Sequence, residues 1–223
     1  MSRVWYGISF SLGISIAATL IAVFIGVVLG IVSGASGGWV DAIIGRVIDL
    51  TLAFPQTLML LAFSAVGILL LEKAGVPSGD PSAALYVILV LGLFGWTSIA
   101  RLVRGQVLSI REQEFVHAST LLGASRMRIY FREILPNLWA PILVSFTLIL
   151  PAFVSAEAAL SFLGVSIKPP TPTLGNILAD SIGYAQYAPV YFFVPAILIA
   201  TIVICFNLLG DGLRDALDPK ANR

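Results

Sequence analysis

Five apolar stretches, each long enough to cross a lipid bilayer as a helix, constrain this chain more than any other feature. A bilayer core of about 30 Å requires roughly 20 apolar residues of α-helix. Of the 223 residues, 58% are hydrophobic and only 11% are charged, whereas ordinary soluble domains are about 25% charged. The sequence therefore predicts an all-α integral membrane protein, with one membrane domain over residues 1–223 and a core at about 8–210. The expected spans are approximately Ile8–Val32, Ile43–Leu71, Ala83–Ala100 (or on to Val107), Leu138–Leu163 and Pro189–Gly210.

Lysine and arginine are distributed unevenly between the two ends of these spans. Cytoplasmic loops of membrane proteins are enriched in both residues, so the end with more of them is expected to be cytoplasmic, together with the C-terminus. Five spans then place the N-terminus outside, and a further upstream helix missing from this chain is our hypothesis for that arrangement. The cytoplasmic side would carry ten cations (Arg46, Arg101, Arg104, Arg111, Arg126, Arg128, Arg132, Arg214, Lys220 and Arg223) and the outer side three (Arg3, Lys73 and Lys168).

A charged segment between the third and fourth spans, residues 106–137, also carries apolar residues at helical spacing. Gly123 suits a helix end, Ser125 can cap a second helix, and Pro136 is expected to end that helix before span four. The segment is therefore predicted to be a helix–turn–helix on the cytoplasmic surface. Its apolar ridge could lie on the lipid interface or fit a groove on a partner protein. The ridge consists of Phe115, Ala118, Leu121 and Leu122.

This segment resembles the EAA loop of type I ATP-binding-cassette (ABC) importer permeases. Gly123 matches the motif glycine. Ten residues then precede the sequence ILPN (Ile134–Asn137), in which Leu135 and Pro136 match the leucine-proline end of the motif. The positions of the motif glutamate and two alanines hold His117, Ala118 and Ser119, so two of the three depart from the pattern.

Longer motifs narrow the resemblance to the C-type permease subunit of dipeptide, oligopeptide and nickel importers. It runs from about Arg3 to Pro219, nearly the whole chain. The motifs are GGWVDAIIGRVIDLTLAFP (Gly37–Pro55), RLVRGQVLSIREQEFV (Arg101–Val116), ALSFLGVSIKPPTPTLGNIL (Ala159–Leu178) and FNLLGDGLRDALDP (Phe206–Pro219).

The resemblance implies a subunit that forms half of the translocation path of an ATP-driven importer in the cytoplasmic membrane of a prokaryote. In that family the loop forms a coupling helix, which sits in a groove of the ATPase subunit. The implied partners are a second permease subunit in a heterodimer, two ATP-binding-cassette ATPase subunits, an extracytoplasmic substrate-binding protein and membrane lipid. Family members usually carry an additional first helix, so the resemblance implies that this chain corresponds to the five-helix core without it. The coupling residues implied are Glu114, His117, Ala118, Ser119, Gly123, Arg128, Leu135 and Pro136.

The sequence offers no catalytic set, so we do not expect an enzyme. One histidine and one cysteine cannot form a catalytic set of a nucleophile, a general base and a residue that orients the base, nor a metal-binding cluster. The phosphate-cradling pattern GxxxxGK[ST] is absent, because none of the three lysines follows a glycine. We therefore expect no cofactor in this chain, with ATP and Mg²⁺ bound by the partner ATPase subunits. No pattern marks a nucleic-acid partner.

Phe54, Pro55 and Glu157 are the candidates for the translocation path or gate. Proline removes a helical hydrogen bond and kinks the helix, so Pro55 in span two marks either a moving segment or a static packing kink. Glu157 lies roughly 28 Å along span four at about 1.5 Å per residue, near the outer face, where a carboxylate can reach water.

Two further expectations concern the span ends. Asp49 is expected to pair locally with Arg46, three residues earlier. The outer segment 166–188 is rich in proline and glycine and too irregular for a long helix. By the resemblance, it faces the substrate-binding protein and the entrance of the path.

Uptake of di- or oligopeptides is the function that this resemblance favours. A nickel or other solute importer of the same family is one alternative. A secondary transporter or channel is another, but it would require paired ionisable residues within the membrane. A truncated and inactive scaffold is the third.

Overall fold

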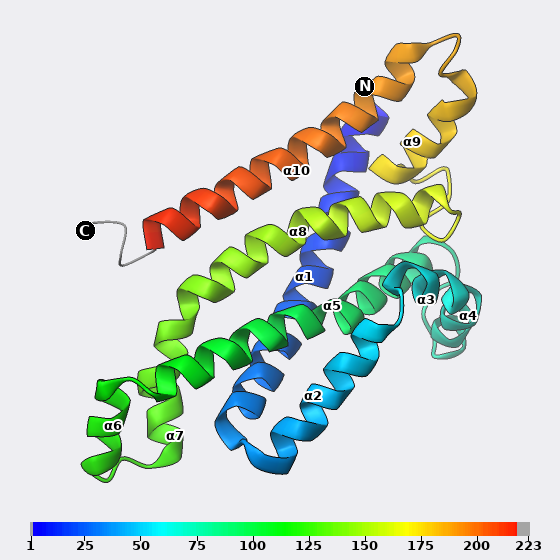
Figure 1. Cartoon of the computed structure of the whole chain (residues 1–223). Coiled ribbons are helices and arrows are strands. Elements are labelled where there is room, and N and C mark those ends of the chain that lie inside the picture. Colours follow the sequence, from blue (N-terminus) through cyan, green and yellow to red (C-terminus); the bar gives the residue numbers. More distant parts are fainter. Residues whose placement is uncertain (1, 218–223) are drawn as a thin grey trace.

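The computed structural model describes residues 2–217, which form ten α-helices and short π- and 3₁₀-helical turns, with no β-strand in that part of the chain (Figure 1). Three residues used in the sequence interpretation, Pro219, Lys220 and Arg223, lie outside the described range. The helices are α1 (Ser2–Ser36), α2 (Gly38–Ala53), α3 (Gln56–Ala62), α4 (Ser64–Lys73), α5 (Asp80–Arg111), α6 (Glu114–Leu121), α7 (Arg126–Ile129), α8 (Trp139–Phe162), α9 (Leu174–Ser181) and α10 (Pro189–Leu217).

Four helical runs within residues 2–217 are long and apolar enough to cross a membrane. They are α1, α5, α10 and the run Arg126–Phe162, which contains α8. These runs confirm four of the five predicted spans, although α1, α5 and α10 are longer than predicted. With 35 residues, α1 is about 52 Å long at ~1.5 Å per residue and therefore extends beyond a bilayer core of about 30 Å.

The predicted span Ile43–Leu71 is wrong as a single helix, because two breaks divide it into α2, α3 and α4. The first break lies at Phe54 and Pro55, both with extended backbone (ψ 136° and 108°). Proline has no N–H to continue a helix and forces the preceding residue out of the helical region. The second break lies at Phe63. Just before it, the Leu60 carbonyl accepts a hydrogen bond of 2.7 Å from the buried hydroxyl of Tyr86. This backbone carbonyl therefore has a hydrogen-bond partner within the protein.

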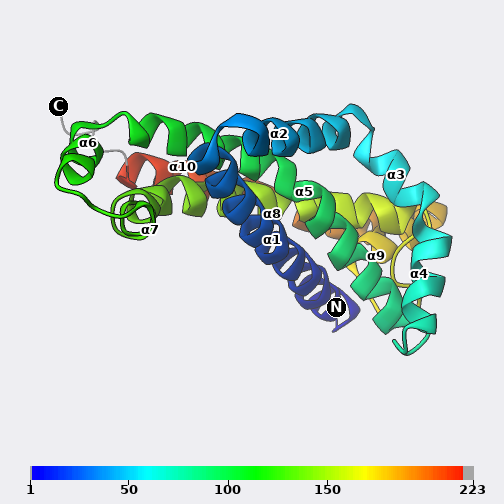
Figure 2. The same cartoon turned by 90° about the horizontal axis from the view of Figure 1, so that it is seen from below.

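Helices α1 and α5 cross at very short range, and Figure 2 shows α1 running beneath α5. Small residues on α1 permit this approach. A Cβ added at Gly30 would lie 2.7 Å from Cβ of Val103 and 2.8 Å from the Ala100 carbonyl oxygen. Gly26 and Gly34 face Ile99 and Val107 in the same way, one turn to either side. Close packing of this kind holds membrane helices together, because the hydrophobic effect does not drive helices to associate within lipid.

The remaining long helices add to this pair from one side. Helix α8 packs against both α1 and α10, and α9 fills the corner between α1, α8 and α10. Most side chains of α10 are exposed, with Pro195 and Gly210 as its buried residues. Its apolar surface therefore suits contact with lipid or with another membrane subunit.

We expect Gly30→Ala to destabilise the α1–α5 pair, because the added methyl group would collide with Val103 and the Ala100 carbonyl. Overpacking of this kind costs about 1–3 kcal/mol. Gly13→Ala is the matched control, since Gly13 lies on the same helix with open space where its Cβ would be. Thermal unfolding in detergent should show a lower midpoint for Gly30→Ala alone. Equal midpoints for the two variants would contradict the close-packing explanation.

Candidate functional site

The segment between α5 and α8, residues 112–138, folds as the predicted helix–turn–helix and projects from one end of the molecule (Figure 1). We call it the charged hairpin. Helix α6 ends in a left-handed turn at Gly123 (φ 79°). The Gly123 and Ala124 N–H groups donate to the Thr120 and Ser119 carbonyls, which is the Schellman arrangement of a helix C-terminus. The Ser125 hydroxyl then caps α7 by accepting from the Arg128 N–H at 3.4 Å. The predicted roles of Gly123 and Ser125 are confirmed.

Two predicted boundaries of this segment are wrong. Helix α5 continues to Arg111, so the charged hairpin begins at residue 112 and not at 106. Pro136 does not end the second helix before span four. The chain passes from α7 through a π-helical turn, η1 (Tyr130–Ile134), and a 3₁₀ turn, η2 (Leu135–Leu138), directly into α8. Because the helix type changes, Pro136 lies in the first turn of η2. N–H groups in a first turn have no acceptor within the helix, so proline removes no hydrogen bond there.

The tip of the charged hairpin exposes large apolar side chains, as the predicted ridge requires. Leu121 and Leu122 are 89% and 88% exposed. Phe115, Met127 and Phe131 are also exposed, whereas Val116 and Ile134 are buried. Ile134 packs in the main hydrophobic core and anchors the second arm to it. An exposed ridge on an anchored support can bind a groove on another protein or lie on lipid.

The other predicted coupling residues are distributed over both arms. Glu114, His117 and Ala118 are exposed on α6, and Arg128 is exposed on α7. The Ser119 hydroxyl lies 3.4 Å from Oε1 of Glu133 and links α6 to the second arm. Leu135 is half-buried and Pro136 is exposed where the hairpin joins α8. The structure thus places all eight residues on one hairpin, with Ser119 as the one that connects its two arms.

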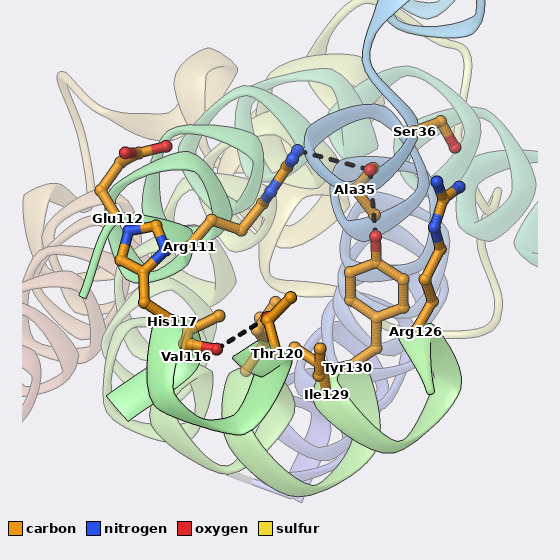
Figure 3. Close-up of a pocket in the computed structure, with 11 residues that line it drawn as sticks. Ala35, Ser36, Arg111, Glu112, Val116, His117, Thr120, Arg126, Ile129 and Tyr130 are labelled. Atoms are coloured by element: carbon orange, nitrogen blue, oxygen red, sulfur yellow. Dashed lines mark hydrogen bonds between the residues drawn. The ribbon is translucent and has the colours of Figure 1, made fainter. Parts of the chain in front are cut away.

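A cavity of about 300 Å³ separates the base of the charged hairpin from the end of α1 (Figure 3). Arg111, the last residue of α5, and Tyr130, in the second arm of the hairpin, reach across it. Nη1 of Arg111 donates to the carbonyl oxygens of Gly34 (2.8 Å) and Ala35 (3.4 Å). The Tyr130 hydroxyl donates to the same Ala35 oxygen at 3.0 Å. Sequence reasoning missed this contact, because no spacing in the chain indicates that these residues meet the end of α1.

Two ion pairs join α2 to α5 near the same end. Arg104 binds Asp41 through two hydrogen bonds, of 2.5 and 2.6 Å. The hydrogen bond from Arg104 lowers the pKa of Asp41 to about 2, against the opposing effect of burial and with help from the Ser33 hydroxyl. Asp49 pairs with Arg101 at 2.8 Å, so the predicted local pair with Arg46 is wrong. The close crossing of α1 and α5 lets α2 lie along α5, which brings Arg101 within reach.

Comparison with known proteins identifies the chain. Residues 26–223 match the family described as "Binding-protein-dependent transport system inner membrane component". The chain belongs to this family. It is therefore a transport permease subunit, a multi-pass membrane protein of a prokaryote, and not an enzyme. Permeases of this kind operate with ATPase and substrate-binding components.

Several curated relatives are similar to this permease over most of its length. The oligopeptide transport system permease protein OppC of Bacillus subtilis (strain 168) is 38% identical over 221 residues, which are 99% of this chain and 68% of the relative. The dipeptide transport system permease protein DppC of Alkalihalophilus pseudofirmus is 40% identical over 219 residues, 98% of this chain and 68% of the relative. The glutathione transport system permease protein GsiD of Escherichia coli O6:K15:H31 is 40% identical over 183 residues, which are 82% of this chain and 56% of the relative.

Solved structures confirm the predicted fold. An inward-facing structure of the MetNI methionine ABC transporter matches with a TM-score of 0.79 and 18% identity, covering 98% of this permease and 97% of the solved chain. An amino acid ABC transporter crystallised with histidines matches with a TM-score of 0.63 and 18% identity, covering 94% and 90%. At these identities the likeness concerns the fold alone.

The expectation that the Glu157 carboxylate of the permease can reach water is wrong. Its side chain is fully buried. It accepts hydrogen bonds from the hydroxyls of Ser11 (2.8 Å) and Ser166 (3.2 Å), and Ser11 in turn accepts from the Leu174 N–H at 3.0 Å. Depth along α8 misled the prediction, because the segment after α8 folds back and α9 covers the carboxylate. Glu157 thus joins α1, α8 and α9 in the permease.

Phe54 and Pro55, the other gate candidates, lie at the break between α2 and α3. Phe54 is 55% exposed and Pro55 is also exposed. Pro55 therefore does more than kink a helix, since the chain ends one helix before it and begins another after it. A role of these residues in the path stays a prediction.

We expect Gly123→Ala to loosen α6, because a residue with a Cβ in the left-handed conformation costs about 1–2 kcal/mol. Gly105→Ala is the matched control, since Gly105 lies exposed on α5 with room for a methyl group and alanine favours helix. Hydrogen exchange of the α6 amides should become faster in Gly123→Ala and not in Gly105→Ala. Unchanged exchange in both variants would show that the Gly123 turn does not hold the hairpin.

Acidification should remove the contribution of the Asp41–Arg104 pair to stability. The pKa of Asp41 is lowered from its usual 3.8 to about 2, so the contribution is present above pH ~4 and is lost as the pH falls toward ~2. Asp41→Asn lacks the charge at every pH. The melting temperature of the unsubstituted permease should therefore exceed that of Asp41→Asn near neutral pH, and the difference should shrink on acidification. A pH-independent difference would contradict this prediction.

Proposed function

We propose that this permease is the membrane-spanning subunit of an ATP-driven importer for di- and oligopeptides. The observation that carries the proposal is the exposed apolar tip of the charged hairpin, Leu121 and Leu122 above all, in a chain of this family. Two leucines almost fully in water are costly to leave uncovered. A groove on an ATPase subunit would cover them.

The proposed assembly contains a second permease subunit, two ATPase subunits and an extracytoplasmic substrate-binding protein. ATP and Mg²⁺ would be held by the ATPase subunits, and the permease would supply half of the translocation path. We place the charged hairpin and the C-terminus in the cytoplasm, because the hairpin end gathers most of the arginines. The opposite end, where α9 and the exposed Tyr187 lie, would then face the binding protein.

Peptide is the substrate class that the relatives support. One is named for oligopeptide transport, another for dipeptide transport, and a third for transport of glutathione, itself a tripeptide. The three relatives belong to systems that carry small molecules with amide bonds and charged termini.

ATP-driven transport requires the permease to exist in two states that the ATPase subunits stabilise differently. Closure of the ATPase pair around ATP would draw the two hairpins of the permease dimer together. The path would then open outward to accept the peptide, and hydrolysis would return it to the inward-open state. In this proposal the eight predicted hairpin residues transmit the motion, and the break at Phe54 and Pro55 is where the path-lining segment bends.

Copurification tests the assembly. Tagged permease, coexpressed with the subunits encoded alongside it and extracted in mild detergent, should bring down a second permease and ATPase subunits. Leu121→Asp should abolish the ATPase association, because a charge would be buried in an apolar groove. Tyr187→Asp is the matched control, since Tyr187 is 87% exposed at the opposite end. Retention of the ATPase by Leu121→Asp would count against the hairpin as its docking site.

Uptake tests the substrate. Cells that lack their own peptide importers should accumulate a labelled tripeptide when they express the complete set of subunits. They should not do so with an ATPase subunit impaired in hydrolysis. Accumulation of nickel or another solute in place of the tripeptide would refute the peptide assignment and leave the assembly intact.

A further inference from the structure

We propose that Tyr130 and Arg111 are positioning residues that carry the movement of the charged hairpin to the corner between α1 and α2. This inference rests on the proposed function and identifies the route by which the hairpin drives the permease. Neither residue belongs to the motif positions that sequence comparison indicates as coupling residues.

Contacts from the end of α5 and from the second arm of the charged hairpin converge on one end of α1. Arg111 is the last residue of α5 and precedes the hairpin, whereas Tyr130 follows α7 directly. Nineteen positions apart in sequence, their side chains donate to the same Ala35 carbonyl oxygen, and Arg111 also donates to Gly34 (Figure 3). Because Arg111 adjoins the first arm and Tyr130 lies in the second, a displacement of the whole hairpin changes both contacts together.

The end of α1 is a suitable acceptor for these groups. The last carbonyl groups of a helix have no partner within it, and a guanidinium is favoured there by the partial negative charge of the helix terminus. Hydrogen bonds to such carbonyls are directional, so they can transmit a pull as well as a push. The cavity of about 300 Å³ beside them leaves room for the hairpin to shift relative to α1.

The corner next to Ala35 converts that pull into a movement of α2. Gly37 and Gly38 both have positive φ (62° and 58°) and turn the chain sharply from α1 into α2. Immediately beyond the turn, Asp41 accepts hydrogen bonds from Ser33 of α1 and from Arg104 of α5. The end of α1, the corner and the first turn of α2 are thus bound together and must move as one piece.

Helix α2 is suited to act as the moving element. Ile48 is its one buried residue among the side chains that the structure describes, so little core packing resists its displacement. Its far end is the break at Phe54 and Pro55, where α3 begins at a different angle (Figure 2). Movement of the corner would therefore tilt α2 about this break and change the ion pairs of Asp41 and Asp49 with α5.

Tyr130→Phe tests this route, because it removes the hydroxyl and keeps the ring. The complete transporter would be reconstituted in liposomes with its ATPase subunits and binding protein. The measured quantity is the number of labelled tripeptide molecules taken up per ATP hydrolysed. We expect this ratio to fall about fivefold, the effect of losing one hydrogen bond of ordinary strength. Tyr6→Phe, at an exposed tyrosine near the other end of α1, should leave the ratio unchanged.

Arg111 provides a second and independent variant. Arg111→Met should lower the ratio, and Arg111→Lys should restore much of it, because an ammonium can still donate to the helix end. Combined with Tyr130→Phe, Arg111→Met should lower the ratio by less than the product of the two single effects, since both residues act on the same carbonyls. Independent, multiplicative effects would overturn the joint role.

The melting temperature separates this inference from a purely structural role. A lower melting temperature with an unchanged uptake-to-ATP ratio in both Tyr130→Phe and Arg111→Met would overturn the inference and leave the proposed function standing. Failure of the unsubstituted permease to assemble with any ATPase subunit would instead refute the proposed function on which the inference rests.

Discussion

The close crossing of α1 and α5 is the contact on which the rest of the structure depends. Three glycines at four-residue spacing, Gly26, Gly30 and Gly34, let the two backbones approach until Ile99, Val103 and Val107 fill the space that larger side chains would occupy. In lipid, van der Waals packing holds helices together, whereas in soluble proteins the hydrophobic effect does so. The crossing also brings the end of α1 beside the last turns of α5, so the arginines of α5 reach the α1 end and α2. A wider separation would remove the ion pairs and the hairpin contacts together.

Satisfaction of backbone polar groups explains why one predicted span is divided and the others are not. Pro151 and Pro195 lie inside α8 and α10, and both helices continue through them. At Pro55 the backbone instead leaves the helical region on both sides of the peptide bond. A break at that depth is tolerated in lipid where neighbouring groups accept and donate for the backbone, as Tyr86 does for Leu60. The division of α2, α3 and α4 is therefore a property of their neighbours as much as of Pro55.

Much of the fold could be predicted from local patterns, because length and apolar character decide where membrane helices lie. The turn at Gly123 and the cap at Ser125 were also predictable, since both depend on residues within one turn. Glu157 could not be placed in the same way. Its surroundings are made by Ser11 and Ser166, which distance along α8 does not reveal. Asp49 illustrates the same limit, because the nearest arginine in sequence is Arg46 whereas the nearest in space is Arg101.

Side chains are packed more closely around α9 than between the charged hairpin and α1, and this difference suits a transporter. At the α9 end, a Cβ at Gly175 would lie 2.5 Å from Cβ of Ser161, and the buried carboxylate of Glu157 binds hydroxyls from α1 and from the segment that leads into α9. Displacement of α9 from α1 and α8 would break these contacts. At the hairpin end, a cavity and a few directional hydrogen bonds separate the hairpin from α1. Since tightly packed regions resist deformation, displacement of the hairpin breaks fewer packed contacts than displacement of α9 from α1 and α8.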